Sequence, residues 1–436
     1  MAGKYFSVHH RFLAWVGRLT NTIILLPHPV SIGNASEEYY YALLKARREK
    51  KKLVILFPFQ MPERFKIPMF DPAILFLESD LLAMKFRSPI SSLLSGIFSL
   101  YWIMVRVWAV FLDKYFKIAL SGYYYRPLAG QDILWRPNAG RLKFDWALAR
   151  EQDWGTQFST PLGLTLDRKI VASCEVERER IGLPRDAWFV CLHVREGGYK
   201  GDWDNSTNAN ISTYLWAIKE IVRRGGWVVR LGDPTMARLP ALEHVIDYPF
   251  SSSKSAIMDV YLLRECSFVV CTSSSILDTA YLLNKPVVVT NSPQWFFGLP
   301  LRHGDLWIYK HLYSRTEKRF ISIQEWFMRA SSITEDRWSL PDCDLIENSE
   351  EEITSVVKEM LDFSNDQGPT DLQQEFRKTH LCAVQEMSKT FRFSRDSKVE
   401  NCNEWFRFAS RMLGWRGEIS AEFLEKNWFK SSRMPN

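Results

Sequence analysis

The 436-residue sequence contains no Cys-x-x-Cys pair and no dense cluster of histidine and carboxylate residues. Its seven cysteines are dispersed along the chain. Two of them, Cys191 and Cys271, fall inside apolar runs, where a buried thiol behaves as a small hydrophobic group. The sequence therefore predicts a protein of the reducing cytosol with no zinc site, no other metal and no cofactor.

Long runs of like charge and targeting segments are also missing. The net charge of +6 is modest for this length, and no basic tail is present. This argues against a nucleic-acid partner, but it fits anionic ligands or anionic lipid headgroups. The amino terminus has no extended apolar region followed by a small-residue cleavage site, so no secretion signal is predicted. We expect a cytoplasmic protein without internal repeats.

Hydrophobic residues make up 46% of the chain, which is enough to form the cores of two or three domains. Residues 187–289 alternate short apolar runs with helical stretches. This alternation is typical of parallel strands joined by crossover helices in a doubly wound α/β sheet. A similar order begins the chain, where Thr22–Leu26 and Leu53–Phe57 read as strands around a helix that starts at Ser36.

These patterns predict three regions. Residues 1–165 form a first Rossmann-like domain with a hydrophobic insert near 86–120, and residues 166–345 form a second Rossmann-like domain with a parallel sheet. Residues 346–436 are mainly helical. Aromatic residues of this last region, among them Phe376 and Trp405, indicate that its helices dock on the body of the protein.

The insert contains the most apolar stretch of the chain, Ile90–Leu112, and three interpretations of it remain open. It is long enough to span a bilayer, but Arg106 lies deep inside it, and Trp102 and Trp108 are aromatics of the kind found at membrane interfaces. An interfacial helix or hairpin is favoured over a buried core or oligomer helix and over a span. Basic residues that would attract anionic headgroups flank the stretch: Lys85, Arg87, Lys114 and Lys117.

Three apolar runs of the second domain end in residues suited to an anionic ligand. Because open α/β sheets bind ligands beyond the carboxyl ends of their strands, we expect these endings to form one site for a diphosphate. The three endings are His193-Val-Arg195-Glu196, Arg230-Leu-Gly232-Asp233 and Thr272-Ser273-Ser274-Ser275.

Arg195 is the leading candidate, because a guanidinium pairs with phosphate oxygens and stays charged at any relevant pH. The alternative is a surface arginine that pairs with Glu196 or Asp202. His193 lies two residues earlier on the same side of the strand. It would either bond the ligand or serve as a structural histidine.

The other two endings also have a structural alternative. Ser273–Ser275 would hold phosphate on the free amides and hydroxyls of a helix start, or simply cap that helix. Gly232 would allow close approach of the ligand next to Arg230, and Asp233 would accept a hydrogen bond from a ribose or base, unless the segment is a plain turn.

A fourth candidate group begins the predicted helix Ser255–Arg264, which follows the short run Val245–Tyr248. Lys254 and Ser255 start this helix and would meet phosphate, while Asp259 would orient the lysine or pair with Arg195. A solvent-facing position is the alternative for Lys254 and Asp259.

The residues from Trp188 to Tyr281 resemble the nucleotide-sugar domain of α1,6- and protein O-fucosyltransferases. The resemblance rests on His193-Val-Arg195, Asp233-Pro and the segment from Asp259 to Ser275. It implies that Arg195 and Ser273–Ser275 hold the diphosphate of a GDP-sugar, with Asp259 as the acidic residue of the motif. Those enzymes usually carry a second arginine where this chain has Glu196, so the resemblance does not specify GDP or fucose.

Nearly the whole chain is similar to a group of bacterial proteins regarded as glycosyltransferases of surface-polysaccharide synthesis. Arg230-Leu-Gly-Asp-Pro, the Tyr248–Ser255 stretch and Ile419–Asn427 carry this similarity. It implies two facing Rossmann-like domains of the GT-B type, in which the first binds a glycan or lipid-linked acceptor and the second a nucleotide sugar. Such enzymes generally need no metal.

The apolar stretch and its basic flanks, under the interfacial interpretation, predict a peripheral position on the inner face of the plasma membrane. We take Arg195 and Glu196 as catalytic candidates, although Asp202 and residues of the first domain remain alternatives for the general base. Two other functions stay open: a noncatalytic sugar-nucleotide-binding protein, and a transferase of a different activated group.

Overall fold

The computed structural model describes residues 15–25, 27, 32–57, 71–116, 161–199, 201, 206–293, 295, 300, 302–332, 340, 342–364, 368–390 and 416–429. The chain divides into two compact units. Unit 1 comprises Met1–Ala149, Pro161–Cys174 and Tyr281–Asn284, and unit 2 comprises Arg150–Thr160, Glu175–Ala280 and Lys285–Asn436. The described carboxyl-terminal helices therefore belong to the same compact unit as the large sheet.

Unit 1 begins with a βαβ element. Strand β1 (Thr22–Leu25) leads through helix α2 (Ile32–Glu49) to strand β2 (Lys52–Ile55), which pairs parallel to β1. This order confirms the predicted strands and helix. The predicted helix start is wrong, however, because α2 begins one turn before Ser36. Buried side chains run along most of α2, among them Ala35, Tyr39, Leu43 and Ala46, so packing against the strands stabilises the earlier start.

The rest of described unit 1 is mainly helical. A 3-10 helix, η2 (Pro72–Phe76), is capped by Asp71, and helix α3 (Pro89–Phe116) occupies the predicted hydrophobic insert. In the described part of the chain, no helix has the length and apolar character needed to cross a membrane. The side chains of Trp102, Arg106 and Trp108, and residue Lys117, lie outside the described residues.

Unit 2 is built on a seven-stranded sheet whose pairings are all parallel. Its order is β12-β8-β7-β6-β3-β4-β5, so the chain moves outward from β3 to β5 and then returns to β6 on the other side of β3. The predicted doubly wound α/β sheet is confirmed. The strands are β3 (Phe189–His193), β4 (Trp227–Arg230), β5 (Val245–Asp247), β6 (Val269–Cys271), β7 (Val287–Ser292), β8 (Leu306–Tyr309) and β12 (Glu418–Ile419).

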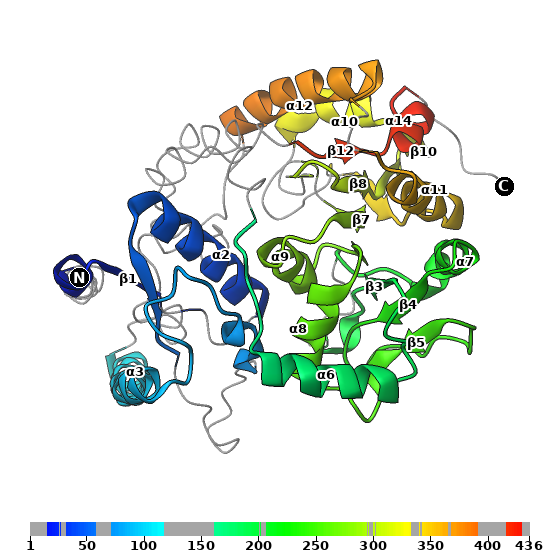
Figure 1. The fold of residues 1–436 in the computed structure, drawn as a ribbon. Helices are drawn as coiled ribbons and strands as arrows, with labels where there is room; N and C mark the ends of the chain where they lie inside the picture. The colour runs from blue at the N-terminus through cyan, green and yellow to red at the C-terminus, as the bar shows by residue number, and fades with distance from the viewer. Residues whose placement is uncertain are drawn as a thin grey trace. The chain divides into compact units, whose positions relative to one another are not determined.

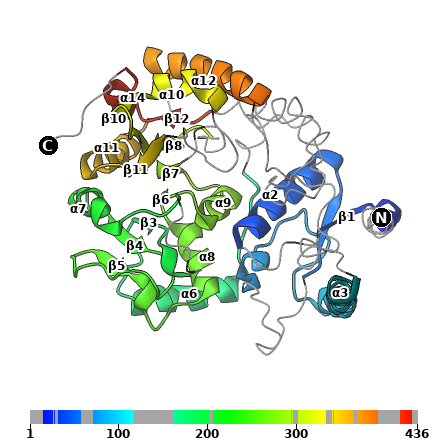
Figure 2. The ribbon, with the colours of Figure 1, turned by 180° about the vertical axis from the view of Figure 1, so that it is seen from behind.

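Helices cover both faces of this sheet. Figures 1 and 2 show α7 (Leu215–Arg223) and α11 (Glu350–Leu361) on one face, and α8 (Ala256–Glu265) and α9 (Ser275–Leu282) on the other. The central strands are consequently buried on both sides, as in other parallel sheets. Cys191 and Cys271 are fully buried there, as predicted. Shorter helical segments of unit 2 are η5 (Gly197–Tyr199), η6 (Ile211–Tyr214), η7 (Tyr248–Phe250) and η8 (Ala330–Ser332), and helix α6 (Arg168–Arg180) runs from unit 1 into unit 2.

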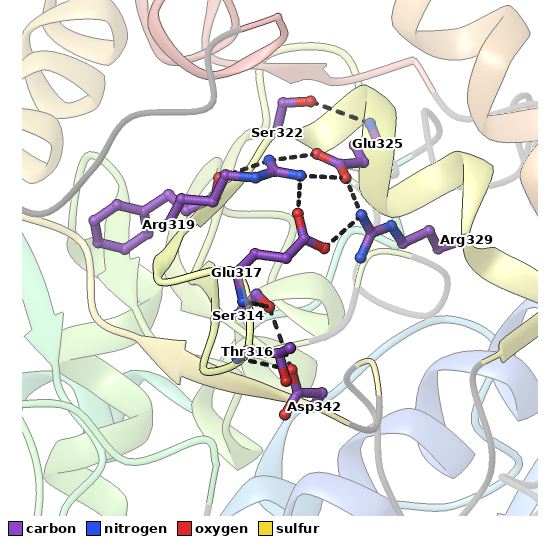
Figure 3. Close-up of polar contacts among 9 residues, drawn as sticks. Ser314, Thr316, Glu317, Arg319, Ser322, Glu325, Arg329 and Asp342 are labelled. Carbon is purple, nitrogen blue, oxygen red and sulfur yellow. Dashed lines mark hydrogen bonds and ion pairs between the residues drawn. The ribbon is translucent and has the colours of Figure 1, made fainter.

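A small antiparallel sheet follows β8. Its order is β10-β9-β11, with β9 at His311–Ser314, β10 at Arg319–Ile321 and β11 at Cys343–Ile346. Figure 3 shows the ion-pair network beside it, in which the Arg319 guanidinium donates to both oxygens of Glu325, each at 2.8 Å, and also contacts Glu317. The hydrogen bond from Arg319 lowers the pKa of the Glu325 carboxyl, so this network is fully charged at neutral pH.

The last helices pack through an aromatic cluster. Helices α10 (Ile323–Met328), α12 (Asp371–Thr390) and α14 (Ala421–Asn427) surround it. The cluster contains Trp295, Phe327, Phe376, His380 and Trp428, all nearly or fully buried. The prediction that aromatic residues dock this region is confirmed for Phe376, whereas Trp405 lies outside the described residues.

His380 makes the stability of this cluster sensitive to acid. Its Nε2 donates to the carbonyl of Trp295 at 2.8 Å, and burial lowers its pKa to about 4. The unfolded chain binds a proton at this histidine below about pH 6.5, but the folded chain does so only below about pH 4. Stability from this group is therefore fully present above pH 6.5 and is lost as the pH falls toward 4.

We predict that His380→Gln, which keeps an N–H donor for Trp295 but does not titrate, flattens the dependence of the unfolding free energy on pH. The slope between pH 6 and 5 should decrease by up to about 1.4 kcal/mol per pH unit, which corresponds to one proton. Denaturant unfolding of the wild type and the variant at several pH values measures this slope. Equal slopes would contradict the assignment.

Candidate functional site

The candidate site lies where the strand order of unit 2 reverses. Strands β3 and β6 are neighbours in the sheet, but the chain leaves them toward opposite edges, so their carboxyl ends flank the switch point. Open α/β sheets bind ligands at such points. His193 and Arg195 follow β3, and Thr272–Ser275 follow β6, so the structure brings together the first and third predicted endings.

Arg195 is fixed to both strands. Its backbone N–H donates to the buried Thr272 hydroxyl at 3.1 Å, and its carbonyl accepts from the N–H of Ala209 at 3.0 Å. The side-chain Nε donates to the Asn208 Oδ1 atom at 3.1 Å. This bond fixes the plane of the guanidinium, whose rigid fork matches the geometry of phosphate oxygens. Glu196 forms an ion pair with Arg230, and Asp202 lies outside the described residues.

His193 connects the same two strands. Its Nδ1 lies 3.1 Å from the Ser274 hydroxyl. Burial lowers the pKa of His193 to about 4, with a further contribution from the charge of Arg230. The imidazole is therefore neutral at physiological pH, and it presents one hydrogen-bond donor and one acceptor rather than a charge.

The residues after β6 combine a buried anchor with accessible hydroxyls. Thr272 is fully buried, and its N–H donates to the His193 carbonyl at 3.2 Å. Ser273, Ser274 and Ser275 are partly exposed, and Ser275 begins α9. The Ser273 hydroxyl lies 3.5 Å from that of Ser292 at the end of β7. The helix start thus presents hydroxyls and amides at the switch point, as a phosphate site requires.

Arg230 occupies a different environment from Arg195. Its side chain is fully buried and donates to Glu196 at 2.8 Å and to Asp247 at 3.2 Å, and it also contacts the carbonyl of Ala237. This network joins β4, β5 and the turn after β3. The geometry therefore favours a structural ion pair for Arg230, and its predicted contact with the ligand stays a prediction.

Glu196 belongs to the same network. One carboxylate oxygen accepts from Arg230 and the other accepts from the N–H of Ala237 at 2.8 Å. Both oxygens of the Glu196 carboxylate are therefore occupied by donors of the surrounding segments. The arrangement favours Glu196 as a residue that holds the turn after β3, and its role as a general base remains a prediction.

Gly232 and Asp233 shape the turn after β4. Gly232 has φ of +149°, and a Cβ there would collide with the Met236 side chain, so only glycine fits. Asp233 accepts from the Thr235 N–H at 2.9 Å and from its hydroxyl. The structure therefore shows the local turn that the sequence offered as the alternative, while the predicted ligand contacts of both residues remain untested.

The fourth predicted group forms the start of α8. The Ser255 hydroxyl caps the helix by accepting from the Met258 N–H at 3.3 Å. The Lys254 ammonium contacts both carboxylate oxygens of Asp259, and it lies 5.0 Å from the centre of the Tyr248 ring. Asp259 therefore orients Lys254, which is one of the two roles that the sequence suggested for it.

The sequence interpretation missed Asn208 and Lys310. Lys310 follows β8, its Nζ donates to the Asn208 carbonyl at 2.7 Å, and its N–H donates to the Ser292 carbonyl at 2.9 Å. Burial lowers the pKa of this lysine, whereas Glu347 opposes the shift. Lys310 directly follows the apolar run Leu306–Tyr309, as Arg195 follows the run that ends at Val194. This shared pattern could have identified Lys310 as a candidate from the sequence. Asn208 thus links two cations at the carboxyl edge of the sheet.

In the described parts of the two units, no group of three or more histidine, cysteine, aspartate or glutamate side chains is arranged to hold a metal ion. The positive groups at the switch point are instead side chains of arginine and lysine. Their arrangement allows the chain itself to neutralise a diphosphate.

No family model and no curated protein matches the sequence. Among solved structures, E. coli ADP-heptose lps heptosyltransferase II is 13% identical over 61% of this chain and 83% of its own, with a TM-score of 0.34. A glycosyl transferase of family 9 from Veillonella parvula is 9% identical over 64% of this chain and 82% of its own, with a TM-score of 0.36.

A third solved structure is the dodecameric iron-containing heptosyltransferase TibC in complex with ADP-D-beta-D-heptose. It is 12% identical over 65% of this chain and 62% of its own, with a TM-score of 0.28. Identities and scores this low do not establish a shared activity. The α/β architecture of this chain is established by its own sheet order.

We predict that Arg230→Met destabilises unit 2 by about 3 kcal/mol, because it leaves the partly buried carboxylates of Glu196 and Asp247 without their cation. Adding Glu196→Gln should recover part of this loss, since one unpaired charge is then removed. Arg180→Met, which removes a 62%-exposed arginine, is the matched control and should cost less than about 1 kcal/mol. Denaturant unfolding measures all three variants. A loss for Arg230→Met no larger than for the control would show that the network is not structural.

Proposed function

We propose that the protein is a glycosyltransferase that moves a sugar from a nucleoside-diphosphate donor to a surface glycan or a lipid-linked acceptor. The observation that carries the proposal is the convergence of Arg195 and Ser273–Ser275 at the switch point between β3 and β6. An oriented guanidinium beside a helix start is suited to a diphosphate. The resemblance of the sequence to glycosyltransferases supplies the reaction type.

The donor, in this proposal, binds to unit 2 and the acceptor is recognised by unit 1, as in enzymes of the GT-B type. An acceptor hydroxyl attacks the anomeric carbon of the donor sugar. The bond between that carbon and the diphosphate oxygen breaks, and its electron pair leaves with the diphosphate. The hydroxyl proton passes to a base, for which the engaged Glu196 is not favoured.

Arg195 stabilises the negative charge that develops on the leaving diphosphate. Its Nε bond to Asn208 fixes the plane of the guanidinium before the donor binds, so little reorganisation is needed in the transition state. The neutral His193 and the Ser274 hydroxyl add hydrogen bonds without competing charge. Lys310, tethered through the same Asn208, contributes the second cation.

We predict that Arg195→Ala and Arg195→Lys each lower turnover ~100- to 1,000-fold, or about 2.7 to 4 kcal/mol, because lysine cannot form the paired charge-assisted bonds of a guanidinium. A thermal-shift screen of nucleoside diphosphates and their sugars, including GDP-fucose and ADP-heptose, first identifies the donor. Turnover is then measured for both variants, together with their melting temperatures.

Arg223→Ala is the matched control, because Arg223 ends α7 at the opposite edge of the same sheet and is 65% exposed. It should retain normal turnover. Near-normal turnover of Arg195→Ala would reject the proposed role of Arg195. Donor binding without any transfer to glycan or lipid acceptors would support a noncatalytic sugar-nucleotide-binding protein instead.

We also predict that turnover persists in excess EDTA, because the proposed charge neutralisation uses side-chain cations and helix amides rather than a metal. The measurement compares initial rates with and without the chelator. Activity that disappears with EDTA and returns on addition of magnesium, manganese or iron would show that a metal carries this charge.

A further inference from the structure

Helix α3 of unit 1 exposes a continuous stripe of large apolar side chains. Seven of them are between 46% and 67% exposed and recur at alternating intervals of three and four residues. This spacing places them along one side of the helix, over a length of roughly 30 Å. We call this surface the α3 stripe; it consists of Ile90, Leu93, Ile97, Leu100, Met104, Val107 and Phe111.

In the amino-terminal half of α3, the opposite side carries small polar residues that face the body of unit 1. Ser91, Ser95 and Ser99 are at most 5% exposed. The Ser95 hydroxyl accepts from the Phe57 N–H at 3.5 Å, and the Ser99 hydroxyl donates to the Ser95 carbonyl at 2.6 Å. Only Phe98 adds a large buried apolar group in this part of the helix.

This distribution is the reverse of that of a water-exposed amphipathic helix, which turns its bulky apolar residues inward. Helices that contact lipid show the observed arrangement, with small residues toward neighbouring protein and large aliphatic residues toward the hydrocarbon. Exposed apolar surfaces of this extent normally mark an interaction site. The orientation of α3 therefore points to an apolar medium on its outer side.

Charge at the two ends of the stripe is complementary to an anionic surface. Arg87 precedes α3, and Lys114 lies in its last turn; both are exposed. Lys85 is also exposed, but it pairs with Glu78 at 2.8 Å. The Arg87 guanidinium stacks over the Phe76 ring, 4.9 Å from its centre, which fixes its position near the helix start. Basic residues at such positions attract anionic headgroups by about 1 kcal/mol each.

A second copy of this chain is the competing occupant, because intervals of three and four residues also occur in coiled coils. Coiled coils place charged residues beside their apolar seam, where these form salt bridges between the helices. The sequence has no charged residue from Ser88 to Val105, so most of the stripe lacks such partners. The composition of α3 therefore favours lipid over a helix of a partner chain.

We propose that the α3 stripe lies in the surface of a bilayer that contains anionic phospholipids, with the helix axis along the membrane plane. The serines keep α3 attached to unit 1, while the stripe enters the boundary between headgroups and acyl chains. The proposal does not depend on the reaction catalysed by unit 2. It would hold a transferase next to a lipid-linked acceptor.

The test is flotation of the full-length protein with vesicles of phosphatidylcholine and phosphatidylglycerol, and with vesicles of phosphatidylcholine alone. We expect the wild type to float with the anionic vesicles and to bind the neutral ones more weakly. Leu100→Glu/Met104→Glu should lower the partition coefficient roughly 100-fold, because it removes two large apolar groups and adds charge. If this variant loses its native circular dichroism spectrum, Leu100→Ser/Met104→Ser replaces it.

The matched control is Trp216→Glu/Met328→Glu, which makes the same charge change at two exposed apolar residues of unit 2. It should bind vesicles as the wild type does. Equal binding by the wild type and the stripe variant, or no binding by the wild type, would overturn the proposal. Sedimentation velocity without lipid tests whether a second copy of the chain binds the stripe. If the wild type is a dimer, the stripe variant is a monomer and neither binds vesicles, the stripe is a dimer interface.

Discussion

Parallel strands direct all their carboxyl ends to one edge of a sheet, and the candidate site of unit 2 depends on this constraint. The chain passes from β3 outward to β5 and returns to β6, so Arg195 and Ser273 come from neighbouring strands although many residues separate them. The hydrogen bond between the Arg195 N–H and the Thr272 hydroxyl closes this junction. If the sheet order were different, the same residues would not share a site.

Two arginines that look alike in the sequence have different physical roles. Arg195 and Arg230 both follow or end an apolar strand, and both were expected to meet the ligand. Arg230 is fully buried because Glu196 and Asp247, from two other segments, supply its countercharges. Arg195 is partly exposed, and its Nε donates to the side-chain amide of Asn208, which orients the guanidinium. The two countercharges of Arg230 come from segments that only the fold brings to it, so no local pattern in the sequence reveals its burial.

Much of the fold could be predicted because β3, β4, β6 and β7 are continuous apolar runs between helical stretches. The switch-point residues could be located for the same reason. Other features depend on distant contacts. The buried residues of α7 are Ala217, Ile218, Glu220 and Ile221, whereas the apolar Leu215 and Val222 are only half-buried. Strand β12 is only two residues long and is defined by pairing with β8, far earlier in the sequence.

That late strand also affects how the protein is made. A ribosome releases residues of a chain in order, so β8 leaves it long before Glu418 and Ile419 are synthesised. Until then, β8 is an uncovered sheet edge, able to pair with strands of other nascent chains. The buried Trp428, which seals the aromatic cluster, emerges later still. The edge of the large sheet at β8 is therefore covered only after β12 has been made.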